Sequence, residues 1–219
     1  MGRDDMDRDE RQPSLRERRR RQTEDEIGIA ALDLFERQGV AATTAEDIAR
    51  AVGISPRTFF RFCATKEQAV MLGDSELEAD LLAELGTLRA GDDAYAALEA
   101  YWHDALIRLG TDPTSGDRFL RVRRLALHEP TVLATSLRLD AERTELRVSA
   151  LVASTGTTPL RARAVIDAFS TMVRLTLEEW VRSVEAGDPA DPLVVYEQCR
   201  VAFREAVAGG SRHSQGARA

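Results

Sequence analysis

Apolar residues recur at helical spacing along most of the chain. Near the N-terminus, Ile27, Ala31, Leu34 and Phe35 share one face of a helix that runs from about Ser14 or Thr23 to Gln38. The same spacing predicts long helices further on, at about Asp93–Leu109, Gly116–His128, Thr131–Ser154, Pro159–Glu185 and Asp191–Val207. No stretch alternates apolar and polar residues as a half-buried strand does. The pattern therefore predicts an all-α fold.

Capping and turn residues divide the N-terminal part into shorter helices. Thr44 is a suitable N-cap for a helix that ends at Gly53, and Ser55 followed by Pro56 predicts the start of the next helix. The two short helices are therefore joined by a turn of about three residues, Gly53-Ile54-Ser55. This arrangement is a helix-turn-helix motif. Thr65 is expected to cap a fourth, longer helix that ends near Gly86.

The second helix of this motif carries basic and hydroxyl side chains. Arg57, Thr58 and Arg61 are expected to point outward, and Arg and Thr are side chains that hydrogen-bond base edges in the major groove. The net charge of the chain is −7, yet the segment from Ile48 to Lys66 contains no acid. This helix is therefore predicted to enter the major groove, while Thr44 and Lys66 are expected to lie near phosphates.

Arginines also gather before the first apolar stripe. Arg18, Arg19 and Arg20 belong to a basic cluster that favours an arm following the phosphates or entering the minor groove. The alternative is a charge run that only improves solubility. Residues 1–14 and 209–219 have almost no apolar side chains to bury, so both ends are predicted to be disordered tails.

Three motifs, AALDLFERQG, TTAEDIARAVGIS and TFFRFCATKE, follow one another between Ala30 and Glu67. In this order and spacing they resemble the DNA-binding domain of the TetR family of transcriptional regulators, over about residues 16–72. The resemblance implies that the residues facing DNA bases or phosphates are Thr44, Ser55, Arg57, Thr58, Phe60, Arg61 and Lys66. It also implies a three-helix core of Ile27, Leu34, Phe35, Ile48, Val52 and Phe59. Family members often have Tyr at the position of Phe60, whose ring cannot donate the corresponding bond to phosphate.

The same resemblance implies a division into a DNA-binding domain, residues 15–73, and a helical-bundle domain, residues 74–208, that binds an effector and dimerises. The large side chains expected to line an effector pocket are Tyr101, Trp102, Phe119, Phe169, Met172 and Trp180. An ordinary apolar core is the alternative for each of them. The RTFFR sequence of the second motif helix is similar to that of regulators that sense acyl-CoA or other lipid-like molecules.

The last two long helices are the predicted dimer seam, because their apolar residues recur every three to four positions. The residues expected at this interface are Val165, Phe169, Met172, Val195, Cys199 and Ala202. With the partner chain, these helices would form the four-helix bundle that the family resemblance implies.

Other functional classes receive little support. Cys63 and Cys199 lie far apart and lack metal-ligand spacing, so neither a disulfide framework nor a metal site is expected. The sequence has no nucleotide-binding or hydrolase motif, so we expect no enzyme and no cofactor. It also has no apolar run of membrane-spanning length, so we expect a cytoplasmic protein.

The predicted function is that of a homodimeric transcriptional repressor. It would bind a palindromic double-stranded DNA operator and be released by a small-molecule effector. The alternative is a helical module that uses the helix-turn-helix for protein contacts. The acid-free segment from Ile48 to Lys66 favours DNA, because a protein-docking helix would be expected to expose apolar anchors instead of arginines.

Overall fold

The computed structural model describes residues 14–188 and 190–209. Every regular element in these ranges is helical, which confirms the all-α prediction. Contacts divide the chain into two compact units between Asp74 and Ser75. The predicted tails fall almost wholly outside the described residues. Ser14 is the N-cap of the first helix, and Gly209 ends the last helix.

The N-terminal unit is built on one long helix, α1 (Leu15–Gln38). It packs against α2 (Ala45–Val52), α4 (Lys66–Ala69) and a short 3-10 helix, η1 (Leu72–Asp74), while α2 also packs against α3 (Pro56–Phe62). The buried apolar side chains at the centre include Ile27, Leu34, Phe35, Ile48 and Phe59, which confirms these members of the predicted core. Val52, the remaining member, is only half-buried.

Local capping chemistry explains the helix starts in this unit. Thr44 and Asp47 form a reciprocal capping box at α2, and the Ser55 hydroxyl accepts a bond from the Thr58 N–H at α3. Gly53 ends α2 at a φ of 74°, which is a backbone conformation that side-chain-bearing residues rarely adopt. The predicted turn between the two motif helices is therefore present.

The fourth helix differs from the prediction of one continuous helix from Thr65 to Gly86. It is interrupted after α4 by η1, and a separate helix, α5 (Ser75–Thr87), follows. The Met71 N–H bonds to the Gln68 carbonyl, three residues back, so the chain tightens instead of continuing the α-helical ladder. Gly73 within the following 3-10 turn also has low helix propensity.

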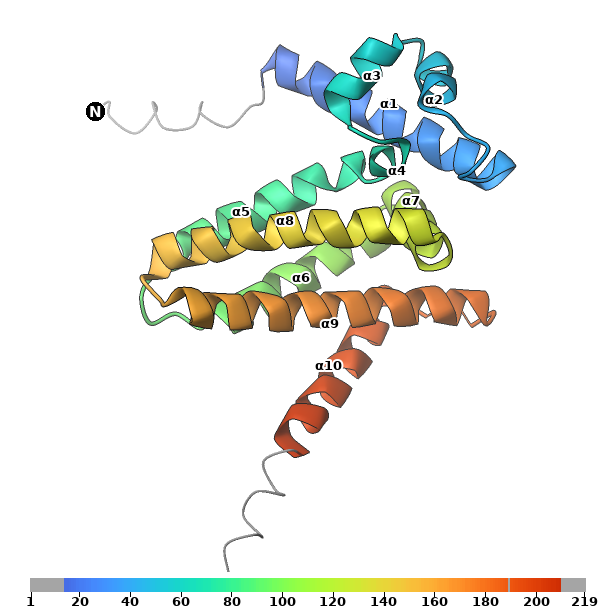
Figure 1. Ribbon diagram of the computed structural model, residues 1–219. Helices are drawn as coiled ribbons and strands as arrows, with labels where there is room; N and C mark the ends of the chain where they lie inside the picture. Colours follow the sequence, from blue (N-terminus) through green and yellow to red (C-terminus); the bar gives the residue numbers. More distant parts are fainter. Residues whose placement is uncertain (1–13, 189, 210–219) are drawn as a thin grey trace, which may run out of the picture. The chain divides into compact units, whose positions relative to one another are not determined.

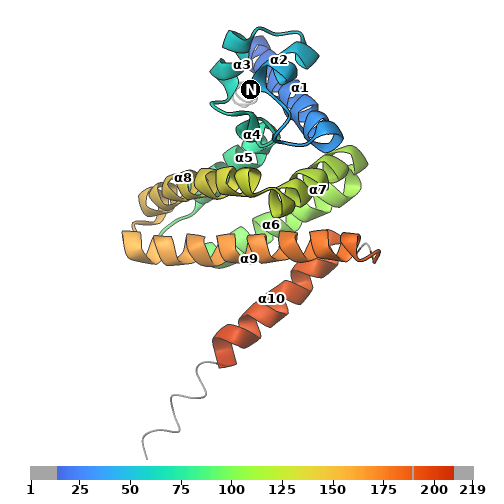
Figure 2. The same cartoon turned by 45° about the vertical axis from the view of Figure 1, so that its right-hand side comes forward.

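The C-terminal unit contains α5, α6 (Ala94–Thr111), α7 (Pro113–His128), α8 (Pro130–Thr155), α9 (Pro159–Glu185) and α10 (Pro192–Gly209). Figures 1 and 2 show α8 and α9 lying side by side along most of their lengths, with α10 leaving at an angle to α9. α8 also packs against α5, and α6 packs against α5, α7, α9 and α10. One apolar core joins these helices.

Prolines and acidic caps set the helix boundaries of this unit. Pro113, Pro130, Pro159 and Pro192 each begin a helix, where a missing N–H breaks no intrahelical bond. The helix predicted from Gly116 starts three residues earlier, at Pro113, because Asp112 caps it by accepting a bond from the Thr114 N–H. Pro189, also expected at a break, lies outside the described residues.

Candidate nucleic-acid interface

The exposed face of α3 presents two arginines and an aromatic ring. Arg57, Phe60 and Arg61 are exposed, and Thr58 is half-buried. The helix reads PRTFFRF and contains no carboxylate, so neither arginine has an acidic neighbour on its own helix. This arrangement offers forked hydrogen-bond donors to the base edges of a major groove.

The inward side of α3 fixes that face in place. Phe59 is fully buried, and its ring meets the ring of exposed Phe60 edge to face, with centroids 5.4 Å apart. At the N-terminus of the helix, the Ser55 and Thr58 hydroxyl oxygens lie 2.9 Å apart. Cys63 closes the helix and is buried, which raises the pKa of its thiol to about 12. The Cys63 thiol is therefore protonated and unreactive at neutral pH.

The basic cluster near the N-terminus is helical. Arg18, Arg19 and Arg20 lie in the first turns of α1, which starts at Leu15 with a capping box between Ser14 and Glu17. An α-helix is about 10–12 Å wide with its side chains, whereas the minor groove is only about 6 Å wide. This geometry favours the predicted role of following the phosphates over that of entering the minor groove, and both stay predictions for these residues. Their exposed side chains stay candidates for phosphate contacts, although Arg20 also pairs with Glu24 at 2.9 Å.

Known regulators share the sequence of this helix-turn-helix. The profile of the tetR family of bacterial regulatory proteins matches residues 29–69, which include α2 and α3. The HTH-type transcriptional regulator TcmR of Streptomyces glaucescens is 33% identical over 175 residues, which cover 77% of this chain and 77% of TcmR. The chain belongs to the TetR family. It is accordingly a DNA-binding transcriptional regulator.

The chain is also similar to a second regulator in sequence and to a solved repressor structure. A regulator from Mycobacterium tuberculosis named for mycofactocin biosynthesis, MftR, is 34% identical over 125 residues, or 57% of this chain and 61% of MftR. Among solved structures, the TetR-family repressor FadR of Thermus thermophilus, crystallised with lauroyl-CoA, is 21% identical with a TM-score of 0.49. That alignment covers 83% of this chain and 93% of FadR.

The ammonium of Lys66, which the family resemblance assigns to a phosphate, makes two hydrogen bonds within the chain, and the phosphate contact stays a prediction. This ammonium donates to the carbonyls of Val40 and Thr43, at 2.6 and 2.8 Å. Thr44, the other expected phosphate neighbour, is exposed, but its hydroxyl donates to the Asp47 carboxylate at 2.6 Å. This bond and the Thr44 N–H lower the pKa of Asp47, so the carboxylate stays ionised at the start of α2.

The predicted pocket residues of this TetR-family chain meet in the apolar core of the C-terminal unit. Trp102, Phe169, Met172 and Trp180 are buried there, and Phe119 stacks on Trp180 with ring centroids 6.4 Å apart. The remaining predicted residue, Tyr101, packs against this core and donates its hydroxyl to the Leu77 carbonyl at 2.7 Å. Burial is the main reason that the pKa of Tyr101 rises to about 12.

Most of the predicted dimer contacts are wrong. Phe169, Met172, Val195 and Cys199 are buried within the single chain, with 1–6% of their surface exposed. Their side of α9 and α10 is covered by the chain's own helices, so they belong to the core and have no surface to offer a partner. Val165 is half-buried and Ala202 is exposed. Exposed apolar side chains do occur elsewhere on α10, at Val194 and Val201.

Sequence reasoning missed a polar network inside the C-terminal unit. The Arg147 guanidinium on α8 makes a two-pronged contact with the Glu78 carboxylate on α5, at 3.0 and 2.5 Å. It also reaches Asp140 at 3.2 Å and the Ser170 hydroxyl at 3.4 Å. Burial alone would lower the pKa of Arg147, but the bonds to Glu78 raise it above its ordinary value. Three helices are thereby joined by one buried side chain.

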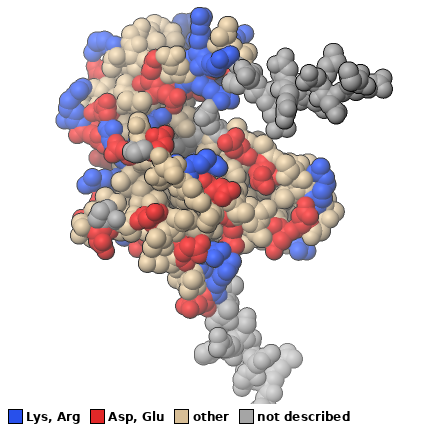
Figure 3. All heavy atoms as spheres, turned by 180° about the vertical axis from the view of Figure 1, so that it is seen from behind, with Lys and Arg blue, Asp and Glu red and all other residues tan. Residues whose placement is uncertain are grey.

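On the face of the molecule seen from behind, surface charge does not by itself identify a binding site. On the side shown in Figure 3, Asp and Glu are interspersed with Arg. In the described ranges, no helix is long and apolar enough to span a lipid bilayer, and no group of three or more His, Cys, Asp or Glu side chains is placed to hold a metal ion. The acid-free sequence of α3 is therefore the feature that singles out one surface.

Proposed function

We propose that this TetR-family regulator is a repressor that binds a palindromic operator as a homodimer and releases it when an effector binds. The observation that carries the proposal is the exposed, acid-free face of α3. A two-fold dimer presents two such helices to half-sites about 34–36 Å apart, which makes the operator palindromic. Docking this face on another protein is the weaker alternative, because its exposed surface is dominated by arginines.

The effector would occupy the C-terminal unit. In support, two buried donors of the apolar core, the Trp102 indole N–H and the Tyr196 hydroxyl, have no hydrogen-bond partner among the described residues. Buried polar groups are rarely left without a partner, so a polar group of an effector could satisfy them. The prediction that this effector is an acyl-CoA or another lipid-like molecule rests on the RTFFR sequence of α3 alone.

The dimer would form through the outer side of α10. Val194 and Val201 lie seven residues apart on this helix, each with about half of its surface exposed (51% and 54%), and Ala202 is exposed beside them. Two turns of an α-helix bring such positions to the same side. This stripe replaces the buried residues that sequence periodicity suggested.

Val201→Asp should therefore convert the dimer into a monomer, because a carboxylate would lose its hydration in an apolar interface. Sedimentation equilibrium measures the mass directly. Leu137→Asp is the matched control, since Leu137 is an equally exposed leucine of the same unit (51%) on α8. If the Val201 variant keeps the dimer mass, or the Leu137 variant loses it, the α10 interface is refuted.

The α3 assignment is tested with Arg57→Ala. An operator is first selected from random-sequence DNA with the wild-type protein, and all single base-pair changes in it are then compared. Removing a forked arginine–guanine contact should cost about 1–3 kcal/mol and relax the preference at one base pair in each half-site. Unchanged preference at every position, with unchanged affinity, would show that α3 does not read the major groove through Arg57.

A further inference from the structure

Two helices of the C-terminal unit carry three buried polar atoms that have no hydrogen-bond partner among the described residues. They are Oε1 of Glu99 and the indole Nε1 of Trp102, both on α6, and the hydroxyl oxygen of Tyr196 on α10. The exposed fraction is 12% for the Glu99 side chain, 5% for Trp102 and 1% for Tyr196. Buried polar atoms are seldom left without a partner, so a group that hydrogen-bonds them is expected here.

The three side chains belong to one cluster. Helices α6 and α10 pack against each other, and Glu99 and Trp102, three residues apart, lie on one side of α6. Burial raises the pKa of Tyr196, and the nearby charge of Glu99 raises it further. The pKa of Tyr95, one turn before Glu99, is raised by the same two causes. Three aromatic side chains therefore lie near one carboxylate.

The charge of Glu99 is already compensated within the chain. Its other oxygen, Oε2, accepts a hydrogen bond from the Arg204 guanidinium at 2.9 Å, and the Arg200 guanidinium lies 4.0 Å away. Arg200 also pairs with Glu197 at 2.8 Å. What Oε1 of Glu99 lacks is thus a hydrogen-bond donor, not a counter-charge. A cationic ligand group here would be repelled by the two arginines, and an anionic one by Glu99.

The unpartnered atoms define what a ligand must offer. A carboxylate oxygen only accepts hydrogen bonds, an indole N–H only donates, and a tyrosine hydroxyl does both. A hydroxyl group can donate one bond and accept two, so one uncharged group satisfies this set. Trp102 and Tyr196 are part of the apolar core, and Tyr95 packs against it. The remainder of such a ligand would therefore be apolar.

We propose that this α6–α10 cluster binds the hydroxyl group of a neutral, otherwise apolar effector, such as a phenol or an alcohol. The ligand hydroxyl donates to Oε1 of Glu99 and accepts from the Trp102 indole and the Tyr196 hydroxyl. The inference rests on the proposed function, which places an effector in this unit, and it names the chemical class of that effector.

The two tryptophans of the chain make the site observable without DNA. In ¹⁵N-labelled full-length protein they give two indole N–H signals, and the signal lost in Trp102→Phe is that of Trp102. Phenol is the probe, and anisole, its methyl ether, is the matched control because it has no donor for Glu99. Phenol should shift the Trp102 signal and bind about tenfold more tightly than anisole, the effect of one hydrogen bond to a charged group.

Benzoate and benzylammonium, which carry opposite charges on the same ring, should leave the Trp102 signal in place. Equal affinities of phenol and anisole would show an apolar cavity without hydroxyl recognition and overturn the proposal. A stronger response to either ion, or no shift with millimolar phenol, would overturn it as well.

Tyr196→Phe tests one of the three atoms by removing only a hydroxyl. Phenol affinity should fall about threefold to tenfold, the loss expected for one hydrogen bond between neutral groups. The Tm should stay within about 1 °C of the wild type, because no bond within the chain is lost. Tyr101→Phe is the stability control: its hydroxyl bonds the Leu77 carbonyl at 2.7 Å, so its removal should lower the Tm by about 2–4 °C. An equal decrease in both variants would show that Tyr196 already has a partner in the free protein, such as a buried water, and would refute the assignment.

The outcomes separate this inference from the proposed function. Loss of the preference for phenol over anisole would refute the hydroxyl site and leave operator binding intact. Failure of the wild-type protein to select any operator would refute the proposed function, while the indole signal would still report whether the site recognises a hydroxyl.

Discussion

Arg147→Ala should destabilise the C-terminal unit by about 3–5 kcal/mol, the loss typical of breaking a buried ion pair by removing one partner. The side chain of Arg147 is 9% exposed and that of Glu78 is 13% exposed. Without the guanidinium, the Glu78 carboxylate would keep only Arg143, 4.0 Å away, as a neighbouring cation in the network. Urea unfolding followed by tryptophan fluorescence measures the loss, because Trp102 and Trp180 both lie in this unit.

Two further variants show whether the buried pair is responsible. Arg174→Ala removes one partner of an exposed ion pair, with Glu178 at 3.1 Å, and should cost less than about 1 kcal/mol. The double variant Glu78→Leu/Arg147→Met replaces the pair with apolar groups and should recover most of the stability. A cost for Arg147→Ala no larger than that of Arg174→Ala would mean that the pair contributes nothing beyond a surface contact.

The positions of Glu78 and Arg147 in the chain explain why the sequence does not reveal their ion pair. Glu78 is on α5, the helix that begins immediately after the N-terminal unit, and Arg147 lies 69 residues later. Helical spacing identifies neighbours three or four residues apart. Helical spacing does not indicate which distant helix will lie against a given face. In the sequence, a buried arginine therefore cannot be distinguished from a solvated one.

Helix boundaries were predictable where local chemistry sets them. Thr44, Ser55 and Asp93 are caps whose side chains bond the first free N–H groups of the helix that follows. The break between α4 and α5 was not predictable in this way. Apolar spacing runs through Val70, Met71 and Leu72 without interruption, whereas in the structure the Met71 N–H bonds to the Gln68 carbonyl and the α-helical ladder ends there.

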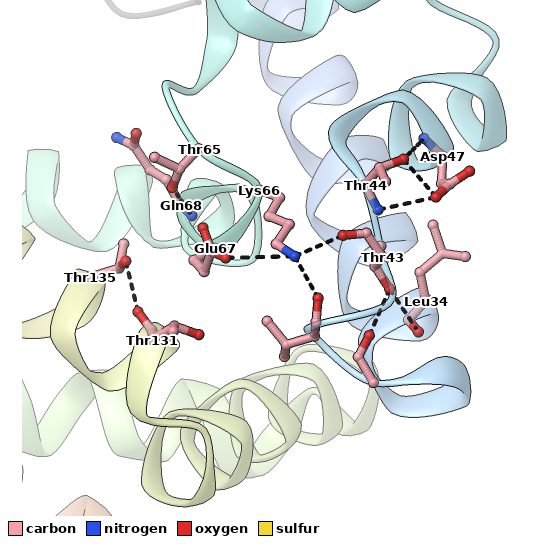
Figure 4. A network of polar contacts seen from close by, with 12 residues as sticks. Leu34, Thr43, Thr44, Asp47, Thr65, Lys66, Glu67, Gln68, Thr131 and Thr135 are labelled. Atoms are coloured by element: carbon pink, nitrogen blue, oxygen red, sulfur yellow. Dashed lines mark hydrogen bonds and ion pairs between the residues drawn. The ribbon is translucent and has the colours of Figure 1, made fainter.

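In the candidate site too, local features were predictable from the sequence and long-range contacts were not. The outward position of Arg57 and Arg61 follows from the buried position of Phe59 and the helical period, so it could be inferred from sequence. The bonds of Lys66 (Figure 4) depend on a loop more than twenty residues away, and resemblance alone assigned it to phosphate. Phe169 and Met172 show the same limit, because an apolar stripe does not reveal whether its own chain or a partner covers it.

Phe59→Ala should unfold or strongly destabilise the N-terminal unit while leaving the C-terminal unit folded. Phe59 is 0% exposed and lies at the centre of a small core, and removing a buried phenylalanine typically costs about 3–5 kcal/mol. On heating, part of the helical circular dichroism signal should then be lost at a lower temperature than in the wild-type protein. The fluorescence of Trp102 and Trp180 should report an unchanged transition, since both belong to the other unit. Operator binding should be abolished.

Phe60→Ala is the matched control, because Phe60 is the next residue on the same helix and has 52% of its surface exposed. Its removal should change the unfolding free energy little, since surface substitutions usually stay within about 0.5 kcal/mol. Any decrease in operator affinity would then come from contacts that the ring makes with DNA. If the two variants destabilise the unit equally, the inward and outward faces of α3 are wrongly assigned, and the groove-facing role of Arg57 and Arg61 would fall with them.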